Sequence, residues 1–237
     1  MISQHTVKAF DADLQELTRL ANTMSSLAAE QVRDTVDALL RGDMQLAHAA
    51  IVKDTAIDAI QREIEDRAVA TIAGRPPMAI DLRHVVGFLR IANDLERIGD
   101  LAKNIAKRAR ALNKKPTLAR PIGKITRMAA LLLDQLKLGM EAFSTRDRVK
   151  AVKAWESDAG IDALFKSVVR NLVEYMSEGR SDITVGVHLL FCAKNIEKMG
   201  DHVTHIAETA YYVIEGCSLA ETRLTPPATT PPNRGAA

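Results

Sequence analysis

Apolar residues in this 237-residue chain recur at alternating steps of three and four over long stretches. This spacing is typical of one face of an amphipathic α-helix, whereas a half-buried strand would alternate every second residue. One such stripe comprises Ile91, Leu95, Ile98, Ala102, Ile105, Ala109 and Leu112. A second comprises Leu189, Ile196, Met199, Val203, Ile206 and Ala210. Both stripes predict helices that pack in a bundle.

Glycine, proline and small polar residues divide the chain into six such segments. The breaks fall at Gly42, at the Gly74-Arg-Pro-Pro turn, over residues 113–123, at Ser144 and near Gly179. The expected helices cover about 7–41, 43–74, 81–112, 124–143, 146–178 and 182–215, with Asp81 as an N-cap. We therefore predict an all-α fold of two tandem, similar three-helix bundles, residues 1–112 and 124–217. The linker is 113–123, and the proline-rich tail, 218–237, is expected to be disordered.

An acidic motif occurs once in each half. Glu96-Arg-Ile-Gly-Asp100 returns as Glu197-Lys-Met-Gly-Asp201, and each acidic residue reappears 101 positions later. The middle helices carry a further pair in each half, which returns 104 positions later: Asp54 and Asp58, then Asp158 and Asp162. Repetition at fixed offsets indicates an internal duplication.

The acidic motifs suggest a cation site. Carboxylates at i and i+4 on a helix repel each other by a few tenths of a kcal/mol, and a glycine inside a helix costs about 1 kcal/mol relative to alanine. Helical geometry places Glu96 and Asp100 on the face opposite the apolar stripe, and Gly99 would let a neighbouring helix approach closely. Oxygen ligands suit Mg²⁺, Mn²⁺, Ca²⁺ or iron. The spacing alone equally allows a solvated face with ion pairs to Lys103 or Lys198.

One histidine suggests a softer metal than the carboxylates do, and the sequence lacks the ligand motif of a di-iron enzyme. His205 lies four residues after Asp201, where the first half has Asn104. As a ligand it would favour a softer transition metal; otherwise it is an ordinary surface histidine. A di-iron enzyme of the ferritin type needs Glu-x-x-His facing the bundle core, and no glutamate here is followed by histidine at that spacing. We therefore expect no enzymatic activity.

Composition narrows the class of protein further. Apolar residues make up 47% and charged residues 26%, and the net charge is only +2. The basic residues around the linker have no interleaved aromatics, and phosphate-binding glycine loops are absent from the sequence, so nucleic-acid and nucleotide binding are not expected. The longest apolar run, 128–133, is far shorter than the roughly 20 residues that span a bilayer. We expect a cytoplasmic protein that reaches a membrane only peripherally, through its partners.

The duplicated motif resembles the PhoU family of phosphate-uptake regulators. The residues that carry the resemblance are Glu96-Arg-Ile-Gly-Asp100 with Asn104-Ile-Ala106, and Glu197-Lys-Met-Gly-Asp201 with Ile206-Ala-Glu208. The resemblance implies an adaptor, commonly a homodimer, between the ATPase subunit of the phosphate ABC transporter and the phosphate-sensing histidine kinase. Such an adaptor represses the phosphate-starvation response when phosphate is plentiful. The alternative is a metal-binding or metal-buffering helical protein unrelated to phosphate control.

The resemblance also implies metal ions, either iron, zinc, manganese or magnesium, at the acidic motifs. The ligand candidates are Asp54, Asp58, Glu96, Asp100 and Asn104 in the first half, and Asp158, Asp162, Glu197, Asp201 and His205 in the second. Two positions depart from the family pattern. Lys107 replaces the usual glutamate, which the second half keeps as Glu208, and His205 replaces the usual asparagine. The two halves are therefore expected to differ in metal preference or occupancy.

Overall fold

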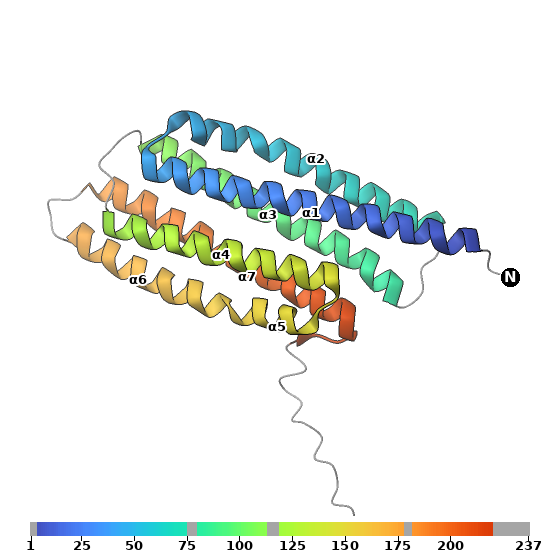
Figure 1. Cartoon of the computed structure of the whole chain (residues 1–237). Helices are drawn as coiled ribbons and strands as arrows, with labels where there is room; N and C mark the ends of the chain where they lie inside the picture. The colour runs from blue at the N-terminus through green and yellow to red at the C-terminus, as the bar shows by residue number, and fades with distance from the viewer. Residues whose placement is uncertain (1–3, 75–79, 113–118, 178–181, 220–237) are drawn as a thin grey trace, which may run out of the picture.

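The computed structural model describes residues 4–74, 80–112, 119–177 and 182–219, and these residues form long helices joined by short connections (Figure 1). The helices are α1 (Gln4–Arg41), α2 (Met44–Gly74), α3 (Ile80–Leu112), α4 (Ala119–Thr145), α5 (Arg148–Glu156), α6 (Asp158–Ser177) and α7 (Ile183–Glu215). Within the described ranges there is no strand. The predicted all-α class is confirmed.

The helices form two three-membered bundles that lie side by side. α1, α2 and α3 pack together, and α4, the α5–α6 pair and α7 repeat the arrangement. α3 lies along α7, and α1 lies along part of α4, so the two bundles share a long interface (Figure 1). The predicted tandem architecture is therefore confirmed, and the contact between α3 and α7 makes it one continuous body.

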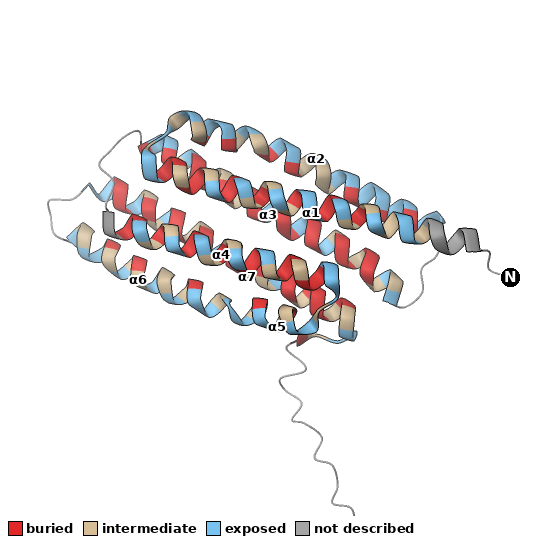
Figure 2. Cartoon of the chain, in the orientation of Figure 1, coloured by how far each residue is buried: buried red, intermediate tan, exposed pale blue. Residues whose placement is uncertain are grey.

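Apolar burial holds the two bundles together. Both predicted stripes are buried, and Ile91, Leu95, Met199 and Val203 are fully enclosed. One apolar cluster extends through both halves. Figure 2 shows the buried positions on the inner sides of the helices, whereas much of α2 and α6 is exposed. Because apolar burial is the dominant stabilising term in folding, this shared core makes the halves depend on each other.

Three predicted boundaries are wrong. The predicted linker extends to residue 123, but α4 already begins at Ala119; Pro121 is tolerated there because the first helical N–H groups have no intrahelical acceptor. Leu219 was expected in a disordered tail, yet it is 4% exposed and belongs to the core. Asp81 lies inside the first turn of α3, which starts at Ile80. The rest of the predicted linker and tail, 113–118 and 220–237, lies outside the described residues.

The middle helix of the second half is divided, contrary to the prediction of one segment over 146–178. α5 ends at Glu156, and α6 starts at Asp158 after a break at Ser157. Asp147 caps α5, because its carboxylate accepts hydrogen bonds from the N–H groups of Val149 and Lys150 at 2.9 and 3.1 Å. Asp43 caps α2 in the same manner. Asp147 follows Asp43 by 104 positions, the offset that relates the two middle helices, so the duplication also repeats this cap.

Candidate functional site

The first-half acidic residues meet between α2 and α3. Asp54 and Asp58 project from α2, and Glu96 and Asp100 project from α3. The prediction that Gly99 permits close approach is confirmed, since a Cβ there would lie 3.1 Å from Ile57 Cδ1 and 3.5 Å from Asp54 Oδ1. The prediction that Glu96 and Asp100 lie on an outer face is only partly right, since their side chains are 18% and 35% exposed. Asp54, which faces them from α2, is 7% exposed. The carboxylates line a seam between two helices.

A lysine lies in the middle of this first cluster. The Lys103 ammonium forms ion pairs with Asp54 and with Asp100, whose Oδ1 lies 2.6 Å away. Burial alone would lower the pKa of Lys103, but its hydrogen bonds to these two carboxylates outweigh burial and raise it. Lys103 is therefore a permanent internal cation at the place where the sequence predicts a metal.

Lys103 also changes the titration of its neighbours. Burial opposes ionisation of Asp100, yet the hydrogen bond and charge of Lys103 prevail and lower the pKa of Asp100. Glu96 has no such partner: burial, followed by the charge of Asp100, raises its pKa, and Arg97 offsets this only partly. The first cluster thus has an internal counter-ion for Asp54 and Asp100 but leaves Glu96 less well compensated.

The second-half cluster has the same acidic residues and lacks the lysine. Asp158 and Asp162 project from α6, and Glu197 and Asp201 project from α7. Gly200 allows a closer approach than Gly99, since a Cβ there would lie 2.8 Å from Asp158 Oδ1. Thr204 occupies the position equivalent to Lys103, 101 residues later. Threonine is uncharged, and its hydroxyl donates a hydrogen bond to the Gly200 carbonyl at 3.0 Å.

The second cluster has two partly exposed lysines but no cation at the position of Lys103. The pKa of Asp158 is raised by burial first, then by the charges of Asp162 and Asp201. Lys194 pairs with Glu197 at 2.6 Å, and Lys198 pairs with Asp201 at 2.7 Å, each from a separate, partly exposed position. Carboxylates that raise one another's pKa are the arrangement that a bound multivalent cation relieves. The second cluster therefore fits an oxygen-ligated metal better than the first.

Sequence reasoning missed a buried glutamine beside each cluster. Gln31 donates from Nε2 to the Ala50 carbonyl at 3.0 Å, and Gln135 donates to the Ala154 carbonyl at 3.1 Å. The Oε1 atoms of both glutamines are buried without a hydrogen-bond partner. Gln135 follows Gln31 by 104 positions, and this offset could have identified them. Each glutamine fixes the middle helix of its half against the first helix.

Two other predicted ligands have different surroundings. Asn104 is exposed on α3. His205 faces the first half of the molecule, where its Nδ1 lies 3.6 Å from Asp94 Oδ1 on α3. His202 lies nearer still, with Nδ1 2.9 Å from the same oxygen. Sequence reasoning assigned no role to Asp94 or His202, because the packing of the two halves is not encoded in a local pattern.

Lys107, which replaces the glutamate usual in the family, is accompanied by a second difference between the halves. Glu208, the equivalent residue in the second half, accepts a hydrogen bond from Trp155 Nε1 on α5 at 3.1 Å. The first half has Ile51 at the position equivalent to Trp155. Isoleucine offers no side-chain donor. The first half therefore lacks both the glutamate and the group that donates a hydrogen bond to it.

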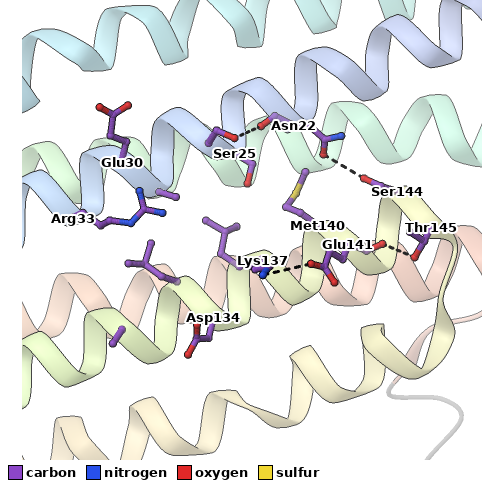
Figure 3. A pocket seen from close by; sticks show the side chains of 15 residues that line it. Asn22, Ser25, Glu30, Arg33, Asp134, Lys137, Met140, Glu141, Ser144 and Thr145 are labelled. Atoms are coloured by element: carbon purple, nitrogen blue, oxygen red, sulfur yellow. Dashed lines mark hydrogen bonds and ion pairs between the residues drawn. The ribbon is translucent and has the colours of Figure 1, made fainter.

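A groove of about 900 Å³ runs between α1 and α4. Figure 3 shows charged side chains of both signs along it, among them Glu30 and Arg33 from α1 and Asp134 from α4. At one end, Ser144 on α4 donates a hydrogen bond to Asn22 on α1 at 3.3 Å. The groove lies apart from both acidic clusters.

Within the described residues, no helix is both long enough and apolar enough to cross a membrane.

Two parts of the chain match the same known protein domain. The model of the PhoU domain matches residues 21–109 and 125–210. The chain is 45% identical over 216 residues to a phosphate-specific transport system accessory protein PhoU homolog from Rhizobium meliloti, and the match covers 91% of each sequence. It is 39% identical to a protein of the same description from Caulobacter vibrioides, over 94% of this chain and 96% of the relative.

Solved structures agree with the fold. The crystal structure of PhoU from Pseudomonas aeruginosa superposes with a TM-score of 0.84 at 30% identity, and the match covers 88% of this chain and 100% of that one. The phosphate transport system regulatory protein PhoU from Streptococcus pneumoniae gives 0.82 at 26% identity, over 89% of this chain and 99% of that one. The duplicated domain, the acidic seams and these likenesses together show that the chain belongs to the PhoU family.

Proposed function

We propose that this protein is an accessory regulator of phosphate transport, a cytoplasmic adaptor between the ATPase subunit of the phosphate ABC transporter and the phosphate-sensing histidine kinase. In this role it represses the phosphate-starvation response when phosphate is plentiful. The observation that carries the proposal is the near full-length similarity to proteins described as accessory to phosphate-specific transport. The acidic clusters contain no Glu-x-x-His arrangement, so we propose binding and not catalysis.

A metal ion in the second cluster is part of this proposal. Asp158, Asp162, Glu197 and Asp201 would hold it, and the raised pKa of Asp158 supports this choice. Four carboxylates favour Mg²⁺, Mn²⁺ or iron over softer metals. The ion would supply positive charge that joins α6 to α7. In the first cluster Lys103 already supplies that charge between α2 and α3, so we propose that the first cluster needs no metal.

Protein partners are supported by an exposed apolar line on α7. Ile183, Val187 and Phe191 follow one another at steps of four and are 60%, 38% and 46% exposed. Neighbouring apolar side chains that are exposed on a protein surface often mark a site of contact with another protein. We propose that this line contributes to contacts with the transporter, the kinase or a second copy of the chain.

Affinity purification from phosphate-replete cells tests the adaptor role. A tagged chain, crosslinked before lysis, is expected to recover the transporter ATPase or the histidine kinase, and substitution of Phe191 by serine is expected to reduce the yield. Substitution of Val52, an apolar residue on α2 that is 55% exposed, serves as the control. Repeated recovery of neither partner would favour the metal-buffering alternative, in which metal content changes function while phosphate control does not.

A further inference from the structure

We infer that Asp94, His202 and His205 form a transition-metal site that joins the two halves, with Zn²⁺ as its best-matched ion. The three side chains each place one ligand atom so that all three atoms lie within 4.8 Å of one another. None of them belongs to the carboxylate clusters proposed above for a hard cation, so this site stands independently of that proposal.

The geometry is close to that of a bound zinc ion. Asp94 Oδ1 lies 2.9 Å from His202 Nδ1 and 3.6 Å from His205 Nδ1. In a tetrahedral site with metal–ligand bonds of about 2.0–2.1 Å, ligand atoms are about 3.3 Å apart. The two observed distances lie on either side of that value. The third separation, between the two histidine nitrogens, is no more than 4.8 Å.

Both helices hold the ligands in place. His202 and His205 are three residues apart and therefore neighbours on one face of α7, and their rings are 5.8 Å apart and nearly perpendicular. Asp94 comes from α3 and its side chain is only 10% exposed. A carboxylate fixed by burial, facing two imidazoles from another helix, is a preorganised arrangement of ligands.

The chemical types of the three groups also match zinc. Neutral imidazole and carboxylate are both zinc ligands, so one divalent ion can contact all three groups together.

Space for a fourth ligand lies beside the cluster. A hollow of about 360 Å³ is lined by Asp94 and His205, and Glu208 borders it as well. Three protein ligands with one position open to water or an added group is a common zinc arrangement. The duplication places Asn195 opposite Asp94, Leu101 opposite His202 and Asn104 opposite His205. These three residues include no carboxylate and no imidazole. Among the described residues, the duplication therefore does not repeat this set of ligands.

The test is titration of the chelator-stripped full-length protein with Zn²⁺, and with Co²⁺ as a spectroscopic probe. We expect one Zn²⁺ per chain, and visible Co²⁺ absorption of the intensity that four-coordinate nitrogen and oxygen ligands give. His202→Gln and His205→Gln should each weaken Zn²⁺ binding at least about tenfold. His205 is 57% exposed, so its replacement should leave the fold intact, which circular dichroism checks.

Two controls separate this site from other binding. His48→Gln removes an exposed histidine on α2 and should leave Zn²⁺ affinity unchanged. Asp158→Asn with Asp162→Asn disables the carboxylate cluster and should also leave Zn²⁺ binding unchanged while it reduces Mn²⁺ binding. The inference is overturned if the wild type binds no Zn²⁺, if the His202 and His205 variants bind it as the wild type does, or if only the carboxylate variant loses it.

Discussion

At the scale of single residues, the two copies of the acidic motif differ most at Lys103 and Thr204. Each follows a motif aspartate by three positions, but only the lysine places an ammonium between two carboxylates. Thr204 instead bonds to its own helix backbone and leaves the carboxylates of the second half facing one another. One substitution thus separates a seam that holds a lysine between two carboxylates from a seam without that cation.

Exchanging this residue tests the distinction. Lys103→Thr should raise metal content by about one ion per chain, because the first half then matches the second. With chelator present, the same variant should lose roughly 1–3 kcal/mol of unfolding free energy, since the buried Asp54 loses its partner. Lys103→Arg keeps the charge and should change metal content little. Elemental analysis and urea melts measure both effects; unchanged metal content in Lys103→Thr would contradict the account.

Gly200 gives a second residue-scale prediction. A methyl group there would press on Asp158 Oδ1 and on Ile161, so Gly200→Ala should displace the carboxylate and weaken Mn²⁺ binding. Stability should change little, because alanine gains about 1 kcal/mol of helix propensity that offsets the crowding. Gly139→Ala is the control, since its Cβ would meet Ile206 at an ordinary 3.5 Å. Calorimetric titration with Mn²⁺ compares the two, and equal affinities would count against a site at Asp158.

At the scale of elements, α5 depends most on its cap. It has 9 residues, and isolated helices of that length are marginal in water. Asp147→Ala removes the acceptor for two backbone N–H groups and should destabilise the protein by about 1 kcal/mol. Asp147→Asn should recover most of this loss. Urea unfolding of the two variants measures the difference, and equal midpoints would show that the cap contributes nothing.

The elements also show what sequence could and could not predict. The periodic stripes in α3 and α7 located the helices, because a buried stripe leaves a repeating apolar pattern. The break at Ser157 was not predicted, since no glycine or proline marks it. Repetition in the sequence identified Asp54 and Asp158. It did not predict that Asp54 is buried and Asp158 partly buried, because α3 and α7 cover these residues only after packing. The Asp94–His202 contact joins residues 108 positions apart and depends wholly on how the halves pack.

At the scale of the whole molecule, His84 helps join the halves. It lies on α3, stacks on Phe88 and meets Phe143 of α4 edge-on, with both ring centroids 5.1 Å away. Arg146 places Nη2 2.9 Å from His84 Nδ1. Burial first, then the charge of Arg146, lowers the pKa of His84 from 6.5 to about 4. The imidazole is therefore neutral in the folded protein at neutral pH.

This pKa predicts a pH-dependent stability. Below pH 6.5 the unfolded chain binds a proton at His84 that the folded chain does not, so stability is lost as pH falls from 6.5 towards about 4. His84→Gln should lower stability at pH 7.5, since ring contacts are lost, and should make the decline between pH 6.5 and 4 shallower. His48→Gln, on an exposed face, should keep the wild-type slope. Identical slopes in all three proteins would contradict a buried neutral His84.

The most direct test of the central claim is a phosphate-starvation reporter, such as alkaline phosphatase, in a deletion strain grown with ample phosphate. The account predicts that deletion switches the reporter on and that the wild-type gene silences it. A gene with Glu197→Gln and Asp201→Asn should silence it less completely than one with His48→Gln. A reporter that stays off in the deletion strain, in a host with no second gene of this family, would contradict the regulatory role.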